Sequence, residues 1–116
     1  SICYYAAKIA NDTNAKAIST LTNSGYTAYQ ISSWRPSAHI LVFTSNKRIL
    51  TQLNLLWGVK SFYYAKSVST DDTVTDVNEI ARQKGFVEKG DFLINLAAMP
   101  ITDKGMVNTL RVSEIE

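Results

Sequence analysis

A short run of small polar residues carries the strongest chemical signal in the sequence. Residues 22–27 read T-N-S-G-Y-T, after a stretch typical of a buried strand and before a stretch typical of a helix. Hydroxyl groups and free backbone N–H groups at a helix start can hold a phosphate, because the helix dipole is positive there. The same hydroxyls can instead cap the helix and bind nothing. Both interpretations stay open for the candidate residues, which are Thr22, Asn23, Ser24, Gly25 and Thr27.

Two further loops of similar composition follow later strands of the sequence. Thr44, Ser45 and Asn46 also lie between a strand and a helix, and here helix capping is the favoured interpretation. Residues 98–107 form a third loop, which contains Lys104 and Gly105. Lys104 could contact an anion, although a solvated charge is the more common role of a loop lysine.

The usual signatures of enzymes are missing from the chain. The sequence contains no G-x-G-x-x-G, no G-x-x-x-x-G-K-[ST] and no G-x-S-x-G, so it offers no dinucleotide, P-loop or hydrolase motif. Its single histidine, His39, begins a strand at the end remote from the three loops, which indicates a structural role. Its single cysteine, Cys3, lies among apolar residues and is expected to be a buried thiol. We therefore expect no catalytic residue and no metal site in this chain.

A cluster of carboxylates, Asp71, Asp72, Asp76 and Glu79, could resemble a metal site. The first two fall in the first turn of an expected helix, where negative charge complements the helix dipole. The structural interpretation is therefore favoured. Tyr26 and Tyr29 could stack on a base, but packing at a helix face or a subunit contact is the simpler expectation.

The elements that must position these loops alternate along the chain. Periodic apolar residues predict helices from Ile2 to about residue 10, from residue 26 to Trp34, through Ile49, Leu53 and Leu56, and from residue 70 to 84. Apolar runs predict strands at residues 17–22, 39–44, 59–65 and 92–96, and a last strand at 109–115. The pattern is typical of a three-layer α/β/α sandwich with a mostly parallel sheet and an antiparallel last strand.

Composition limits the classes of protein and partner. The 116 residues suit one domain, 46% of them are hydrophobic, and the net charge is +2. This charge is too small and too scattered to favour a nucleic acid or an anionic membrane surface. No apolar run approaches the roughly 18 residues of a membrane span. The chain starts inside an apolar-periodic segment, without Met or a leader, so we expect a piece of a longer protein.

Several motifs together resemble the C-terminal domain of the pyruvate kinase family. They occur in family order and spacing over nearly the whole chain: A-K-A-I at 15–18, L-T-N-S-G-Y-T-A at 21–28, W-R-P at 34–36, T-S-N at 44–46, L-W-G-V at 56–59, G-F-V-E-K-G-D at 85–91 and G-M-V-N-T at 105–109. The resemblance implies a five-stranded sheet of order 3-2-1-4-5 with the last strand antiparallel, all within a single domain of residues 1–116.

The resemblance also implies a function for a parent protein. That parent would be a cytoplasmic glycolytic homotetramer that transfers phosphate from phosphoenolpyruvate to ADP with Mg²⁺ and K⁺. Its catalytic barrel and lid domains would lie outside this chain, which would serve as a regulatory and assembly domain. In regulated relatives the T-x-S-G-x-[ST] loop holds a phosphate of a sugar bisphosphate. The match carries this role to Thr22, Asn23, Ser24, Gly25 and Thr27, and more loosely to Lys104 and Gly105.

The chain departs from the regulated members of the family at charged positions. Asn23 stands where some of them have Lys, and Tyr26 where many have Arg, and both changes should weaken the binding of a sugar bisphosphate. Met106 and Val107 also replace two hydroxyl residues. Another phosphorylated effector, or none, stays open. The alternative function is a free-standing α/β domain that binds a small molecule or phosphate and shares only the fold.

Overall fold

Strands and helices alternate along the chain as the apolar patterns predict. The computed structural model describes residues 1–66, 68–97 and 108–116. The elements in chain order are α1 (Ile2–Thr13), β1 (Ala17–Leu21), α2 (Tyr26–Ser33), β2 (His39–Thr44), a 3₁₀ turn η1 (Lys47–Ile49), α3 (Leu50–Leu53), β3 (Val59–Tyr63), α4 (Thr70–Gln83), β4 (Phe92–Ala97) and β5 (Thr109–Glu114). The predicted boundaries of the strands agree within two residues.

The five strands form one mixed sheet in the order β3-β2-β1-β4-β5. Strand β1 pairs in parallel with β2 and β4, and β2 pairs in parallel with β3. Only β5 is antiparallel, with Leu93 opposite Ser113 and Asn95 opposite Arg111. Because β1 and β2 are parallel, the turns that follow these two strands lie at the same end of the sheet. The expected strand order and direction are confirmed.

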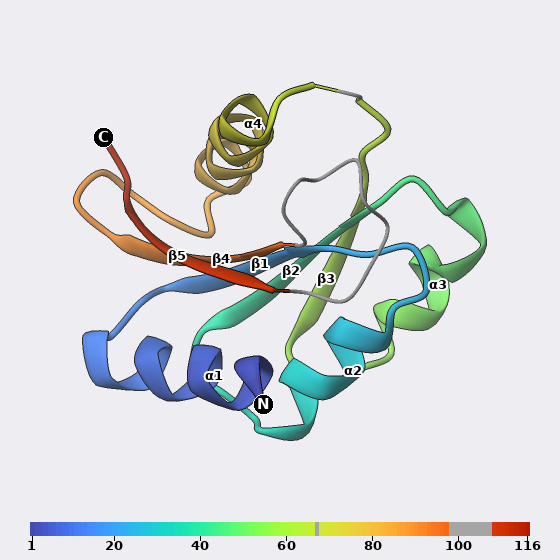
Figure 1. Ribbon diagram of the computed structural model, residues 1–116, viewed down its shortest axis with the longest axis horizontal. Helices are drawn as coiled ribbons and strands as arrows, with labels where there is room; N and C mark the ends of the chain where they lie inside the picture. Colours follow the sequence, from blue (N-terminus) through green and yellow to red (C-terminus); the bar gives the residue numbers. More distant parts are fainter. Residues whose placement is uncertain (67, 98–107) are drawn as a thin grey trace.

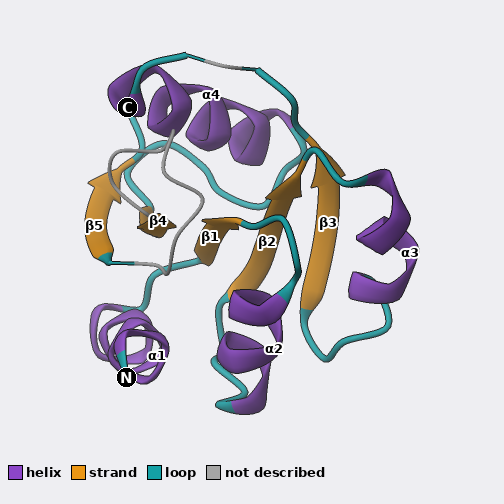
Figure 2. Cartoon of the chain, turned by 45° about the vertical axis from the view of Figure 1, so that its right-hand side comes forward, coloured by secondary structure: helices purple, strands orange, loops and turns teal. Residues whose placement is uncertain are grey.

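Helices cover both faces of the sheet, which makes the three layers of the predicted sandwich. Helices α1, α2 and α3 lie on one face, and α4 lies on the other (Figures 1 and 2). Residues 40–44 of β2 are fully buried, as expected for a strand covered on both sides. Successive residues of a strand therefore pack into two cores, one on each face of the sheet. Ile18, Ile40 and Ile94 pack into the core on the side of α1 and α2.

The core beneath α4 is made by the alternate residues of the same strands. It joins Ala17, Leu41, Phe43 and Leu93 to Val77 and Ala81 of the helix, together with Tyr64, Val87 and Ile115. Each large aliphatic side chain buried in this way contributes about 1.5–3 kcal/mol to folding. On the other face α1 packs through the small side chains of Cys3, Ala6, Ala7 and Ala10, and the thiol of Cys3 is free and buried.

The third helix is shorter than the sequence predicts. It ends at Leu53, so Leu56 lies beyond it, and Leu55 is exposed. Asn54, the helix C-cap, turns its side-chain oxygen to the backbone N–H of Ser61 in β3, at 2.9 Å. The hydroxyl of Ser61 donates in turn to the carbonyl of Leu50 at 2.8 Å. These bonds hold the end of α3 against β3. The helix therefore stops at Leu53, although the apolar periodicity predicted one more turn.

Candidate functional site

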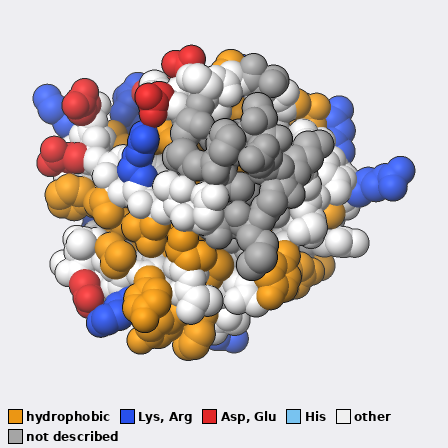
Figure 3. Space-filling model, in the orientation of Figure 1, with side chains coloured by type: hydrophobic (Ala, Val, Ile, Leu, Met, Phe, Trp, Pro, Cys, Tyr) orange, Lys and Arg blue, Asp and Glu red, His pale blue; other side chains and the backbone are white. Residues whose placement is uncertain are grey.

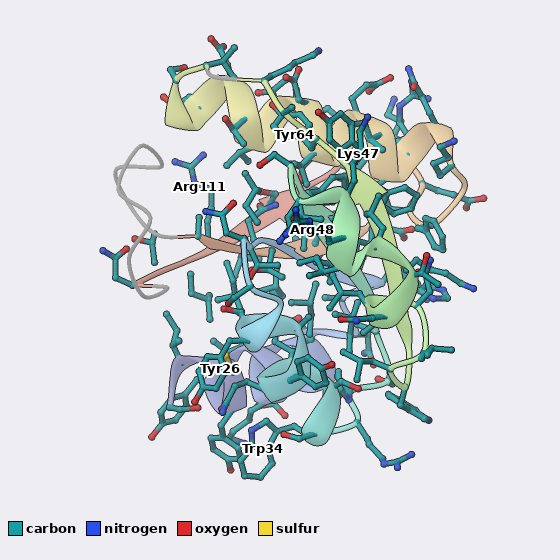
Figure 4. All side chains as sticks on the ribbon, turned by 90° about the vertical axis from the view of Figure 1, so that its right-hand side faces the viewer. Tyr26, Trp34, Lys47, Arg48, Tyr64 and Arg111 are labelled. Carbon is teal, nitrogen blue, oxygen red and sulfur yellow. The ribbon has the colours of Figure 1, made fainter. Side chains whose placement is uncertain are left out.

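The hydroxyl-rich turn joins β1 to α2 at the edge where the parallel strands end. Figure 4 shows the molecule from this side, with Tyr26 of α2, Lys47 and Arg48 of η1 and Arg111 of β5 all labelled. The N–H of Thr22 donates to the carbonyl of Phe43 in β2, at 3.0 Å, which fixes the start of the turn. The first sequence-predicted loop therefore lies where an open α/β sheet places its ligands.

Two hydroxyl groups hold the turn in shape. The hydroxyl oxygen of Thr22 accepts from the N–H of Gly25 at 2.9 Å, and that of Ser24 accepts from the N–H of Tyr26 at 3.3 Å. Both oxygens thus accept bonds within the turn, but neither is the N-cap side chain of α2, because the N-cap is Gly25. An oxygen that accepts keeps its own O–H to donate, so these bonds leave Thr22 and Ser24 able to contact an anion.

The first turn of α2 keeps free donors. Its N-cap is Gly25, which has no side chain to accept from the helix. The N–H of Tyr29 donates to the carbonyl of Gly25, but no group of the described residues accepts from the N–H of Thr27 or Ala28. Free N–H groups at a helix start, next to hydroxyl donors, are the arrangement that binds phosphate groups.

Gly25 is required by the backbone of this turn. Its φ of +85° lies in the left-handed region, and a Cβ atom here would come within 2.9 Å of Cδ2 of Leu53. Leu53 belongs to the core beneath α1 and α2. The glycine therefore lets the turn approach α3 closely, and a Cβ here would require either the side chain of Leu53 or the turn to shift.

The second sequence-predicted loop caps a helix, as expected, and also bonds to the first loop. Asn46 is the N-cap of η1, because its side-chain oxygen accepts from the N–H of Arg48 at 3.0 Å. The backbone N–H of Asn46 donates to the hydroxyl of Thr44 at 3.0 Å. The side-chain amide of Asn46 also donates to the carbonyl of Asn23, at 3.0 Å. This bond joins the two loops, and nothing in the sequence pattern predicted it.

Basic side chains beside the loops were missed by the sequence reasoning. Arg48 is exposed, and its guanidinium makes no ion pair or hydrogen bond with any described residue. It follows Asn46 by two residues, and the side chain of Asn46 bonds both to the N–H of Arg48 and to the carbonyl of Asn23, so the backbone of Arg48 lies near the hydroxyl loop. Lys47 instead lies over the ring of Tyr63, 4.8 Å from its centroid. The available signal was the pair of basic residues directly after T-S-N.

The other chemical candidates lie away from the turn or outside the described residues. Lys104 and Gly105 lie outside the described residues. His39 begins β2 at the far edge of the sheet and contacts Phe86 edge to face. Asp71 and Asp72 fall in the first turn of α4, as predicted. In the part of the chain that the structure describes, no three His, Cys, Asp or Glu side chains are grouped to hold a metal ion. We therefore assign no described residue to Mg²⁺ or K⁺.

One tyrosine has a perturbed acidity, but it lies in a packed core. Burial raises the pKa of Tyr64, and its hydrogen bond to Asp76 adds to the effect. The hydroxyl of Tyr64 donates to Oδ2 of Asp76 at 2.8 Å, and Lys66 lies 3.8 Å from the same oxygen. Asp76 is on α4, so this pair ties the helix to the end of β3. It gives no sign of acid–base catalysis.

Exposed aromatic residues gather on α1 and α2. Tyr4 and Trp34 meet edge to face, with ring centroids 4.8 Å apart, and both are exposed. Tyr5, Tyr26 and Tyr29 are exposed as well. Figure 3 shows hydrophobic side chains over this region, in the lower part of the view. A shallow pocket of about 250 Å³ lies between Tyr4, Lys8, Asp12 and Trp34. None of the helices described in the structure is long and apolar enough to cross a membrane.

Comparisons with known proteins agree with the motifs. A family model described as "Pyruvate kinase, alpha/beta domain" matches residues 1–113. The pyruvate kinase of Lactococcus lactis is 37% identical over 114 residues, which cover 96% of this chain and 22% of the relative. That of Lactobacillus delbrueckii is 33% identical over 108 residues, covering 93% and 18%. That of Clostridium acetobutylicum is 34% identical over 107 residues, covering 92% and 23%.

These matches go beyond a shared fold. They span nearly the whole chain, while the chain spans only about a fifth of the length of these relatives. The residues matched are the same ones that form the sheet of order β3-β2-β1-β4-β5 and the turn before α2. The chain belongs to the pyruvate kinase family and corresponds to its α/β domain.

Proposed function

We propose that this domain regulates and assembles a pyruvate kinase, and that the turn before α2 receives a phosphate group of an effector. The observation that carries the second part is the set of free donors at one place: the N–H groups of Thr27 and Ala28 and the hydroxyls of Thr22 and Ser24. Family membership supports the first part. The natural protein would transfer phosphate from phosphoenolpyruvate to ADP in the cytoplasm, with Mg²⁺ and K⁺ held outside the described residues.

The chemistry of the turn limits the effector. Asn23 and Tyr26 provide no positive charge, so the turn alone offers a phosphate only neutral donors. Arg48 can supply a positive charge, because its guanidinium has no partner among the described residues and the side chain of Asn46 bonds both to the N–H of Arg48 and to the carbonyl of Asn23. Charge-assisted bonds are the stronger ones, so Arg48 should carry much of the affinity for a phosphorylated ligand.

The aromatic surface of α1 and α2 supports the assembly role. Exposed Tyr and Trp side chains in one area are typical of protein contacts, because each buries a large apolar surface. Tyr4, Tyr5 and Trp34 are therefore the residues that we expect to contact another subunit or another part of a homotetramer. Alone, the 116-residue chain should form no ATP from phosphoenolpyruvate and ADP, and turnover by it would refute the placement of catalysis elsewhere.

The anion site is tested by the melting temperature in sodium phosphate against sodium chloride at equal ionic strength. A ligand that binds only the folded state stabilises it by RT ln(1 + [L]/Kd), or about 1.4 kcal/mol at ten times Kd. We expect phosphate to raise the melting temperature. Ser24→Asp should abolish the rise, because it places a negative charge on the site, and Arg48→Gln should reduce it.

A matched control separates the site from general charge effects. Ser33→Asp adds the same charge at the other end of α2, where it is exposed, and should keep the response to phosphate. If phosphate stabilises Ser24→Asp and Ser33→Asp equally, the hydroxyls only cap the helix. Assays of phosphoenolpyruvate turnover in the full natural protein test the catalytic proposal separately, so either proposal can fail alone.

A further inference from the structure

A chain of hydrogen-bonded polar side chains lies between the sheet and α4, with Asn95 and Ser19 buried and Asn78 and Ser113 partly buried. Asn95 of β4 is 5% exposed, and its side-chain amide donates to the hydroxyl of Ser19 in β1 at 2.8 Å and to Oδ1 of Asn78 in α4 at 3.0 Å. Its Oδ1 accepts from the hydroxyl of Ser113 in β5 at 2.6 Å. Both amide hydrogens and the oxygen of Asn95 are thus in use. The family function described above employs none of these groups.

Asn95 joins α4 to β5, two elements that make few other contacts with each other. Helix α4 stands by itself on its face of the sheet among the described elements (Figure 1), and it joins the core beneath it through Val77, Ile80 and Ala81. Strand β5 is an edge strand, and among the described strands it pairs only with β4. A further link, the ion pair of Arg111 with Asp71 at 3.2 Å, is exposed and so contributes little.

The planar amide makes the three bonds of Asn95 depend on one another. Its oxygen and nitrogen turn together about one bond, so the orientation that satisfies Asn78 on α4 is also the one that satisfies Ser113 on β5. If one partner is lost, a buried polar group is left unpaired, and the amide must turn or admit water to recover. Either change weakens the bond on the other side.

We infer that Asn95 couples α4 to β5, so that the helix and the edge strand loosen and tighten as one unit. The N-terminus of α4 lies on the side of the sheet where the parallel strands end (Figure 1). Strand β5 is one outer strand of the sheet, and β3 is the other. The coupling therefore connects the candidate ligand edge with an outer strand. It depends only on the buried network and stands whether or not the turn before α2 binds phosphate.

Hydrogen–deuterium exchange in the full natural protein tests the coupling. Asn78→Ala changes α4, yet it should accelerate exchange of the β5 amides by about fivefold to tenfold, the loss expected for a broken buried hydrogen bond. Amides of β2 report global unfolding, and the β5 rates are measured relative to them. Asn78→Asp keeps an acceptor for Asn95, so it should leave the β5 rates close to those of the unmodified protein.

A control and a reciprocal variant complete the test. Thr75→Ala removes an exposed polar side chain from α4 outside the network, and it should leave β5 unchanged. Ser113→Ala on β5 should accelerate exchange in α4, and Ser113→Thr, which keeps the hydroxyl, should restore it. Unchanged β5 exchange in Asn78→Ala, or equal acceleration in Asn78→Ala and Asn78→Asp, would overturn the inference. If Asn78→Ala does not fold, the Ser113 variants decide it by the same criteria.

Discussion

The glycine at the start of α2 permits a quantitative test of the turn. Gly25→Ala adds a single methyl group, but this group meets two obstacles. The φ of +85° is a backbone conformation that L-residues rarely adopt, and the new Cβ would lie 2.9 Å from Cδ2 of Leu53. Leu53 is 1% exposed and packed in the core, so it has little room to move aside.

The expected cost has two parts. A left-handed backbone costs a residue with a Cβ about 1–2 kcal/mol. Overpacking a filled core by one methyl group costs about 1–3 kcal/mol. Together they remove about 2–5 kcal/mol from a folding free energy that is about 5–15 kcal/mol for a domain. The displaced turn should also lose its response to phosphate, because the N–H groups of the helix start would move.

Two other glycines provide matched controls for the backbone part. Gly85 and Gly90 also have positive φ, at +83° and +89°, but a Cβ at either would meet no atom within 4 Å. Urea unfolding of Gly85→Ala and Gly90→Ala should therefore show only the backbone cost of about 1–2 kcal/mol. Gly25→Ala should cost more, and the excess should vanish in a Leu53→Ala background. Equal losses at all three glycines would refute the close contact with Leu53.

Two further predictions concern named hydrogen bonds. Asn46→Ala removes both the η1 cap and the bond to Asn23, so it should cost about 1–2 kcal/mol in urea unfolding, whereas Asn46→Asp keeps the cap to Arg48 and should cost less. The pKa of Tyr64 is raised by burial and by its bond to Asp76, so the stability linked to its neutral form is present below its ordinary pKa of 10.0 and is lost as the pH rises through the folded value. The midpoint of urea unfolding should thus fall more steeply above pH 10 in the unmodified protein than in Tyr64→Phe, and equal slopes would contradict this account.

Most of the fold follows from local rules in the sequence. The unbroken apolar run of β2 predicted a strand covered on both faces, and Asp71 and Asp72 predicted the first turn of α4. The order of the strands was an expectation from family resemblance, because local patterns do not say which strands pair. The predicted length of α3 was wrong. The side chain of Asn54 bonds to Ser61, seven residues away, and apolar periodicity cannot predict such a contact.

For the candidate site, the sequence predicted the turn before α2 but not the contacts that this turn makes with other loops. The run T-N-S-G-Y-T predicted a turn before a helix, and the hydroxyls of Thr22 and Ser24 do shape it. The bond from Asn46 to Asn23, and the place of Arg48 beside the turn, depend on two loops meeting after separate strands. Likewise, Asn95 is one polar residue in an apolar strand, and its partners come from three other elements.

The docking of Asn54 on β3 has a consequence for solubility. Strand β3 is an outer strand, and Tyr64 directs its N–H to β2, so the N–H of Ser61 points away from the sheet. An unoccupied N–H there would invite a strand from another molecule, which is how sheets grow into aggregates. Because the side chain of Asn54 already accepts from it, an incoming strand would have to displace a bond that the chain makes with itself. The N–H of Ser61 is therefore not available to pair with a strand of another molecule.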